Sequence, residues 1–284
     1  MKSKNLFKNF SVITISLWLG IFAILPLGLI LITSFLTQDH LGIAKFTLTF
    51  NNYLNLVNYA YIKIFLQSLQ LAISCTIICL IIGYPFAFIV ARCQSKYRSL
   101  LLLLIIIPFW TSSLIRTYAI MAMLKTKGIL NSLLLALGFI DQPLQIIYSY
   151  AAVLIGSVYD LLPFMILPLY TNIEKLNPEY LEAALDLGAN RFTTLVKVII
   201  PLTKSGIIAG CVMVFLPSMT IFYIPVLLGG AKNLLLGNLV EYQFLSANNW
   251  PLGTAISVVI TLVMVTFILL YWYSSKKITK EKFP

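Results

Sequence analysis

Six long apolar stretches constrain the fold of this chain more than any other feature. They cover about residues 11–36, 64–90, 100–123, 150–170, 205–228 and 252–273. Each has roughly the 20 mostly apolar residues that a helix needs to cross a bilayer. Only 10% of all residues are charged, against about 25% in soluble domains. We therefore expect an all-α, polytopic membrane protein with six transmembrane helices in a single domain over residues 1–284.

The first stretch, residues 11–36, is expected to be a retained helix and not a cleaved signal peptide. It is longer than the apolar region of a signal peptide, and no small-residue cleavage site precedes Thr37.

The distribution of basic residues predicts how the helices are oriented. If the N-terminus is cytoplasmic, 14 of the 20 Lys and Arg residues lie inside: Lys2, Lys4, Lys8, Arg92, Lys96, Arg98, Lys175, Arg191, Lys197, Lys204, Lys276, Lys277, Lys280 and Lys282. Five lie outside, and Arg116 lies within a span. Cytoplasmic loops carry such an excess, so we expect both termini in the cytoplasm. Because these charges are spread over four segments, the net charge of +11 does not indicate nucleic-acid binding.

The sequence lacks the common motifs of nucleotide hydrolysis and of enzymes. There is no G-x-x-x-x-G-K-[ST] loop, no H-E-x-x-H and no Cys/His cluster, and the single histidine is His40. We expect a transport subunit with no catalytic residue, no metal and no cofactor, although a mechanism that uses carboxylates alone stays open. If transport is driven by ATP, a separate subunit must hydrolyse it.

The longest predicted cytoplasmic loop, residues 171–204, is expected to form two short helices. Asn177 followed by Pro178 is typical of a helix start. Gly188 is a suitable left-handed C-terminal residue for this helix. A second helix, over about residues 191–200, is expected to stop at Pro201.

This loop resembles the E-A-A-x3-G-x9-I-x-L-P signature of ABC importer permeases. The matching residues are Glu182, Ala183, Ala184 and Gly188, then nine residues and Val198-Ile199-Ile200-Pro201. The resemblance implies a type I ABC importer permease (MetI-like) fold. It also implies that Glu182, Ala183, Ala184, Asp186, Gly188 and Pro201 couple the permease to its ATPase. An ordinary amphipathic surface helix is the alternative.

Five further segments are similar to permeases of the spermidine/putrescine importer family. They are Gly83–Ala87, Pro108–Thr111, Leu114–Tyr118, Leu162–Met165 and Gly229–Asn233. This similarity implies a polyamine importer in the bacterial inner membrane. It also implies the partners: a second, homologous permease subunit in a heterodimer, two ATPase subunits and a periplasmic polyamine-binding protein.

Asp160 is the one acidic residue that falls within a predicted span. A carboxylate there costs roughly 2.5–3.5 kcal/mol on insertion scales, so it needs a role or a partner. At about 1.5 Å per residue, Arg116 lies about 24 Å and Asp160 about 15 Å from the inner ends of their helices. This difference of about 9 Å argues against a direct ion pair. A structural pair or hydrogen bond and a place on a cation pathway both stay open for Asp160.

Aromatic rings near Asp160 are candidates for contacts with a passing polycation. Tyr159, Trp110, Phe222 and Tyr223 could each offer a ring face, which attracts ammonium groups. Packing against lipid or other helices is the alternative for each. Glu241, in an outer loop, is a candidate contact for the binding protein or simply a solvated carboxylate.

Three other functions remain as alternatives. An ABC importer for another small solute, such as thiamine, iron or an anion, would keep the E-A-A loop. An ion-gradient secondary transporter would leave the spacing of that loop unexplained. A membrane scaffold without transport activity would have no substrate path.

Overall fold

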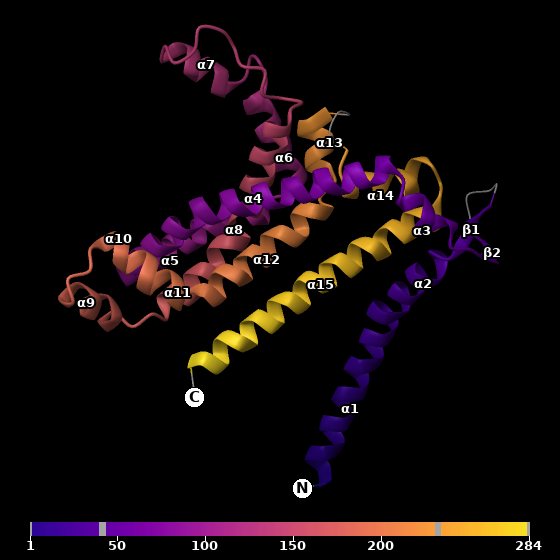
Figure 1. Ribbon diagram of the computed structural model, residues 1–284, viewed down its shortest axis with the longest axis horizontal. Helices are drawn as coiled ribbons and strands as arrows, with labels where there is room; N and C mark the ends of the chain where they lie inside the picture. Colours follow the sequence, from indigo (N-terminus) through magenta and orange to yellow (C-terminus); the bar gives the residue numbers. More distant parts are fainter. Residues whose placement is uncertain (1, 40–43, 231–233, 283–284) are drawn as a thin grey trace. The chain divides into compact units, whose positions relative to one another are not determined.

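The computed structural model describes residues 2–39, 44–230 and 234–282, and most of them are helical (Figure 1). The chain divides into two compact units, Met1–Ile62 with Leu239–Met264 and Lys63–Asn238 with Val265–Pro284. Within the described residues, five helices are long and apolar enough to cross a membrane: Phe10–Thr33, Tyr59–Arg92, Ser113–Ala136, Tyr150–Glu174 and Trp250–Leu270. A sixth is reached if the bent pair Arg191–Leu202 and Lys204–Thr220 is one span. The prediction of an all-α polytopic protein is confirmed.

The first unit begins with a long helix and continues into a small hairpin. Its elements are α1 (Lys2–Leu19), a π-helical segment (Gly20–Ile24), α2 (Leu25–Thr33), β1 (Leu36–Gln38), β2 (Ala44–Leu48) and α3 (Asn51–Leu56). The strands are antiparallel, with Leu36 opposite Leu48. The buried Asn52 side chain donates to the carbonyls of Ser34, at 2.9 Å, and Leu36, at 2.8 Å. These bonds fix the point where the helix ends and the hairpin begins.

The second unit contains most of the remaining elements. They are α4 (Tyr59–Arg92), α5 (Ser95–Ile106), a 3-10 turn (Ile107–Trp110), α6 (Ser113–Leu124), α7 (Ile129–Ala136), α8 (Tyr150–Glu174), α9 (Glu179–Asp186), α10 (Arg191–Thr194), a π-helical segment (Leu195–Ile199), α11 (Ile200–Leu202), α12 (Lys204–Thr220) and α13 (Tyr223–Gly229). The chain then passes through α14 (Leu236–Glu241), a π-helical segment (Tyr242–Ser246) and α15 (Trp250–Lys282). Three helices, α4, α14 and α15, have residues in both units.

Helix α8 is the central helix of the second unit. It packs along α12 and also contacts α13 and α6. Glycines allow the close approach: a side chain at Gly210 would collide with Met165, and one at Gly156 with Leu228. Small residues at helix contacts are the usual device by which membrane helices gain van der Waals packing. The buried core residues Leu161, Met165 and Leu169 follow this contact along α8.

The predicted continuous helix over residues 100–123 is wrong, because the chain breaks there into α5 and α6. The 3-10 turn contains Pro108, and Thr111 and Ser112 are extended, with ψ of 152° and 134°. Proline supplies no backbone N–H and disfavours helical geometry in the residue before it. Figure 1 shows α5 and α6 running in different directions.

The second prediction that fails is the end of the cytoplasmic helix at Pro201. The helical path continues through Pro201 to Leu202, and the bend of 71° follows at Thr203. The π-helical segment before Pro201 shifts the hydrogen-bond register, which accommodates a residue without an N–H. The bend is anchored on α4, since the hydroxyls of the buried Thr203 and Tyr84 lie 2.9 Å apart.

Candidate functional site

Asp160 lies on α8, in the part of the second unit where α6 and α13 pack against it. Only 8% of the residue is exposed. Tyr223, the first residue of α13, donates its hydroxyl to Asp160 Oδ2 at 2.8 Å. Gly156 precedes Asp160 by one helical turn, so the same face of α8 that admits α13 also presents the carboxylate. The close packing of these two helices thus brings Tyr223 to Asp160.

Arg116 on α6 is the counter-ion of this carboxylate. Its Nη2 lies 2.9 Å from Asp160 Oδ1, and both side chains are 11% exposed. The sequence-based argument against a direct pair was wrong. That argument measured the depth of Arg116 with a constant rise per residue along one continuous helix. The break at Ile107–Trp110 and the extended residues Thr111 and Ser112 change the direction of α6, so this depth does not apply.

Two aromatic rings complete the surroundings of Arg116. The guanidinium carbon lies 4.8 Å from the centroid of the Phe109 ring, which is cation–π geometry. The Phe109 ring in turn packs edge-on against Phe164 of α8, at 5.3 Å between centroids. The cation is therefore held between a carboxylate and an aromatic face.

The polar groups of this site are incompletely hydrogen-bonded. The Arg116–Asp160 contact has the distance of an ion pair but not the angles of a hydrogen bond, so Oδ1 of Asp160 has no hydrogen-bond donor among the described residues. Arg116 Nε and the hydroxyl of the buried Ser157 also have no hydrogen-bond partner in the described part of the chain. Ser157 precedes Asp160 by three residues and therefore shares its helix face. Asp160 Oδ1 and the Ser157 hydroxyl can therefore each accept a further hydrogen bond, in a buried site where an unpaired polar atom is costly.

The other predicted pathway residues are at the edge of this site or outside it. Phe222 packs its ring edge-on against Tyr223, at 5.8 Å, and is 45% exposed. Tyr159 is 47% exposed and Trp110 is 79% exposed. Glu241 is the last residue of α14 and is partly buried. None of these four forms a hydrogen bond or ion pair with Asp160 among the described residues, and their roles stay predictions.

The E-A-A segment forms a helix whose ends are built as the sequence suggests. Asn177 accepts a hydrogen bond from the N–H of Glu179, at 3.1 Å, and so caps the start of α9. Gly188 has a φ of +81°. The N–H of Gly188 bonds the Leu185 carbonyl and that of Ala189 bonds the Ala184 carbonyl, which together form a Schellman motif. Asn190 then caps α10 by accepting from Thr193 N–H, at 2.7 Å.

The outer face of this segment is available for contact with another protein. Ala184 is buried, whereas Glu182, Ala183 and Asp186 are exposed. Large apolar side chains are exposed beside them: Tyr180, Leu187 at 88% and Phe192 at 74%. An exposed apolar group flanked by charges is typical of a docking surface.

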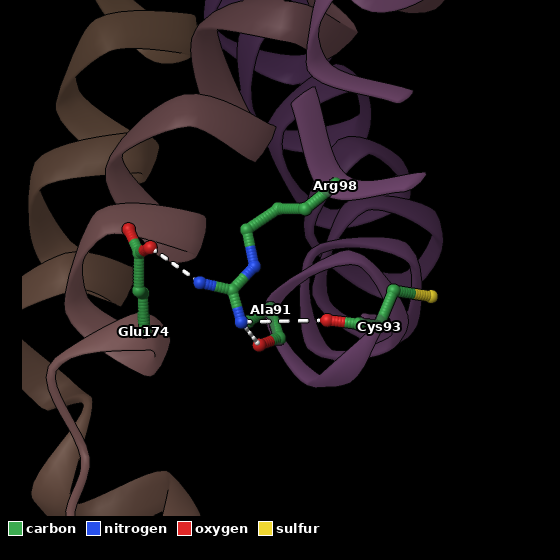
Figure 2. A network of polar contacts seen from close by, with 4 residues as sticks. All are labelled: Ala91, Cys93, Arg98 and Glu174. Atoms are coloured by element: carbon green, nitrogen blue, oxygen red, sulfur yellow. Dashed lines mark hydrogen bonds and ion pairs between the residues drawn. The ribbon is translucent and has the colours of Figure 1, made fainter. Parts of the chain in front are cut away.

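Arg98 links α5 to the C-terminal ends of α4 and α8, as Figure 2 shows. From α5 its Nη1 donates to Glu174, the last residue of α8, at 2.7 Å. Its Nη2 donates to the carbonyls of Ala91, at 2.9 Å, and Cys93, at 3.4 Å, at the end of α4. The cation thus neutralises the negative end of α4 and fixes where the chain leaves α8.

Sequence reasoning missed three contributors to these sites. Ser157 could have been found from its three-residue spacing to Asp160. Phe109, next to the chosen Trp110, could not, because the break in the helix decides which of the two rings faces Arg116. The link between Arg98 and Glu174 joins residues that are far apart in the sequence, with no pattern that pairs them.

Comparison with known proteins places the chain among transport proteins. Residues 83–279 match the family model described as "Binding-protein-dependent transport system inner membrane component". The chain is 48% identical over 281 residues to the spermidine/putrescine transport system permease protein PotB of Salmonella typhimurium (strain SL1344), covering 99% of this chain and 98% of that protein. It is 49% identical over 270 residues to PotB of Escherichia coli (strain K12), covering 95% and 98%.

A solved structure shares the fold at much lower identity. It is the crystal structure of a bacterial alginate ABC transporter in complex with an alginate pentasaccharide-bound periplasmic protein. The TM-score is 0.77 at 18% identity, covering 98% of this chain and 96% of that one. The type I permease architecture implied by the sequence signature agrees with this similarity. Residues 231–233 of the last resemblance segment, Gly229–Asn233, lie outside the described residues.

Proposed function

The chain belongs to the family of binding-protein-dependent transport system inner membrane components, and on this premise we propose that it is the permease subunit of an ATP-driven importer of spermidine and putrescine. The observation that carries the proposal is the identity of 48–49% to polyamine permeases over nearly the whole chain. Similarity of this extent covers the membrane path as well as the coupling segment. The chain forms half of the translocation path.

The partners follow from this role. A second, homologous permease completes the path, two ATPase subunits supply the energy, and a periplasmic polyamine-binding protein delivers the substrate. The apolar window within Phe10–Thr33, none of which is buried in the described chain, is consistent with contact to lipid or to the second permease. Glu241 is the contact offered to the binding protein.

The E-A-A segment, which comprises α9 and the turn at Gly188, transmits the movement of the ATPase to the permease. With both termini in the cytoplasm, α9 lies on the cytoplasmic side, where its exposed apolar and charged residues bind the ATPase. Ala183 permits close approach, Glu182 and Asp186 orient the docking, and Gly188 forms the turn. Pro201 lies just before the 71° bend between Arg191–Leu202 and Lys204–Thr220, so movement of α9 is transmitted to α12 through this bend. Closure of the ATPase pair then switches the cavity from inward to outward access.

Asp160 and Tyr223 provide polar groups for the substrate on the membrane path. A polycation cannot cross hydrocarbon without hydrogen-bond acceptors, and Asp160 is the one acidic residue within the predicted spans. The exposed rings of Phe222, Tyr159 and Trp110 add weak cation–π contacts along the path. Weak contacts suit a path from which the substrate must leave.

Competition for uptake tests the proposed substrate. Cells that express the complete importer as their single polyamine system are given labelled spermidine together with an excess of putrescine, thiamine, ferric iron or sulfate. The proposal predicts that putrescine lowers spermidine uptake and that the other three solutes leave it unchanged. Inhibition by thiamine, iron or sulfate without inhibition by putrescine would contradict it.

A further inference from the structure

Arg116 occupies the place that chemistry would assign to an ammonium group. The guanidinium lies 2.9 Å from the Asp160 carboxylate and 4.8 Å from the Phe109 ring centroid. A carboxylate and an aromatic face are the two groups that bind an organic ammonium most readily. We propose that Arg116 is a tethered substitute for the substrate, and that an ammonium group of the passing polyamine displaces it from Asp160. This inference rests on the proposed function.

The geometry of the pair favours exchange over a fixed structural bridge. An Arg–carboxylate bridge that stabilises a protein interior is commonly bidentate, with its remaining polar atoms hydrogen-bonded. Here one Nη approaches one oxygen without hydrogen-bond angles, and Nε has no hydrogen-bond partner among the described residues. The Arg116 cation is therefore held less firmly than the site could hold one.

The site has acceptors to spare for an incoming ammonium. Asp160 Oδ1 and the Ser157 hydroxyl are both without a hydrogen-bond partner in the described chain, and both lie on the same face of α8. A primary ammonium has three donors on a compact head, so it can serve both acceptors. Tyr223 stays bonded to the other carboxylate oxygen and holds it in place.

Exchange explains how the site can be selective for cations without retaining them. In the absence of substrate Arg116 neutralises Asp160, so no uncompensated charge is left in the membrane. When an ammonium displaces it, the site holds two cations and one anion. Repulsion between Arg116 and the ammonium then lowers the affinity and favours release.

The test compares spermidine binding by variants of the permease–ATPase complex in lipid nanodiscs without the binding protein. Arg116→Gln removes the competing cation, so spermidine should bind at least about tenfold more tightly and be transported more slowly. Arg116→Lys keeps a competing cation, here a primary ammonium, and should bind spermidine no more tightly than the wild type does. Lys125→Gln, which removes an exposed positive charge after α6, is the matched control and should change neither quantity.

Weaker or unchanged binding by Arg116→Gln, at an assembly state equal to that of the control, would overturn the exchange. So would equally tight binding by Arg116→Lys and Arg116→Gln, because charge would then not be the cause. These outcomes leave the proposed function intact. Failure of the wild-type complex to bind or import spermidine overturns the proposed function and the exchange together.

A second measurement needs no variant and so does not depend on whether Arg116→Gln folds. Phenylglyoxal modifies exposed guanidinium groups, and mass spectrometry reports each arginine separately. Spermidine should raise the modification of Arg116 several-fold, while the arginines outside the site, Arg92 and Arg191, react as before. Protection of Arg116, or no change, would overturn the exchange.

Discussion

Asp160 shows how one buried charge defines a site at the scale of a residue. The carboxylate is 8% exposed, accepts the Tyr223 hydroxyl and pairs with Arg116. An ionised group in a membrane span is expensive and is kept where it has a partner and a task. The sequence was sufficient to single out Asp160, because a charge within an apolar stretch is visible without a structure. It named Tyr223 for its aromatic ring and not for the hydroxyl that bonds Asp160. It was insufficient for Phe109 and for the Arg116 pair, because both depend on a break in the helix path.

Neutralising Asp160 should impair substrate passage more than assembly. In Asp160→Asn the amide keeps the shape but cannot attract an ammonium, so spermidine uptake should fall about tenfold or more. Tyr223→Phe loses one hydrogen bond to a charged group, which contributes about 1.5–3 kcal/mol. Spermidine uptake by this variant should therefore fall less than uptake by Asp160→Asn. Initial uptake rates over a range of spermidine concentrations measure both. Co-purification of the ATPase with each variant is the control, and uptake kinetics of Asp160→Asn equal to the wild type would remove Asp160 from the path.

At the scale of elements, the ends of α9 were predictable and the course of the third span was not. The cap at Asn177 and the left-handed Gly188 depend on local backbone chemistry, which short sequence patterns report. The break between α5 and α6 and the continuation through Pro201 depend on π and 3-10 adjustments. A proline in the sequence marks where such an adjustment is possible without saying whether the helix stops, bends or continues.

Gly188 and Gly138 lie in two separate C-terminal motifs of the same type, so variants at the two positions can distinguish a loss of ATPase coupling from local structural damage. Gly188 ends α9 with φ +81° and Gly138 follows α7 with φ +73°, each in a Schellman-type arrangement. Proline at either position cannot adopt a positive φ and loses the N–H that the motif uses, so the local strain is alike. We expect Gly188→Pro to insert normally and to abolish uptake, with Gly138→Pro as the matched control that keeps it. Membrane insertion and uptake are measured side by side, and normal uptake by Gly188→Pro would refute the coupling role of α9.

The Arg98 contacts predict an order of stability among three variants. Arg98→Gln loses the ion pair with Glu174 and both carbonyl contacts at the end of α4, whereas Glu174→Gln loses the ion pair alone. The two side chains are 29% and 38% exposed, so the pair itself contributes about 1 kcal/mol or less. Arg98→Gln should therefore lower the midpoint of thermal unfolding of the purified complex more than Glu174→Gln does. Arg92→Gln, which removes an exposed arginine at the end of α4, is the control. A decrease in the unfolding midpoint as large as that of Arg98→Gln would show that the carbonyl contacts contribute nothing.

At the scale of the whole molecule, fold class and family were readable from the sequence because both depend on patterns repeated along the chain. Long apolar helices and the spacing of the E-A-A segment persist whatever the detail of packing. The packing of α8 against α12 and α13 was not readable, since single glycines such as Gly210 and Gly156 acquire meaning only from the residue opposite. Under the proposed function the chain contributes a membrane path and a docking helix, and we expect it to work as part of an assembly with a separate ATPase.

The central claim is that a separate ATPase drives transport through α9. It is tested by reconstituting the complex of both permeases and the ATPase into proteoliposomes with the binding protein, and by measuring accumulation of labelled spermidine. Accumulation is expected with ATP on the ATPase side, and none is expected with a non-hydrolysable analogue or with the Gly188→Pro permease. Uphill accumulation by the permeases without the ATPase, or with an ion gradient in place of ATP, would contradict the account.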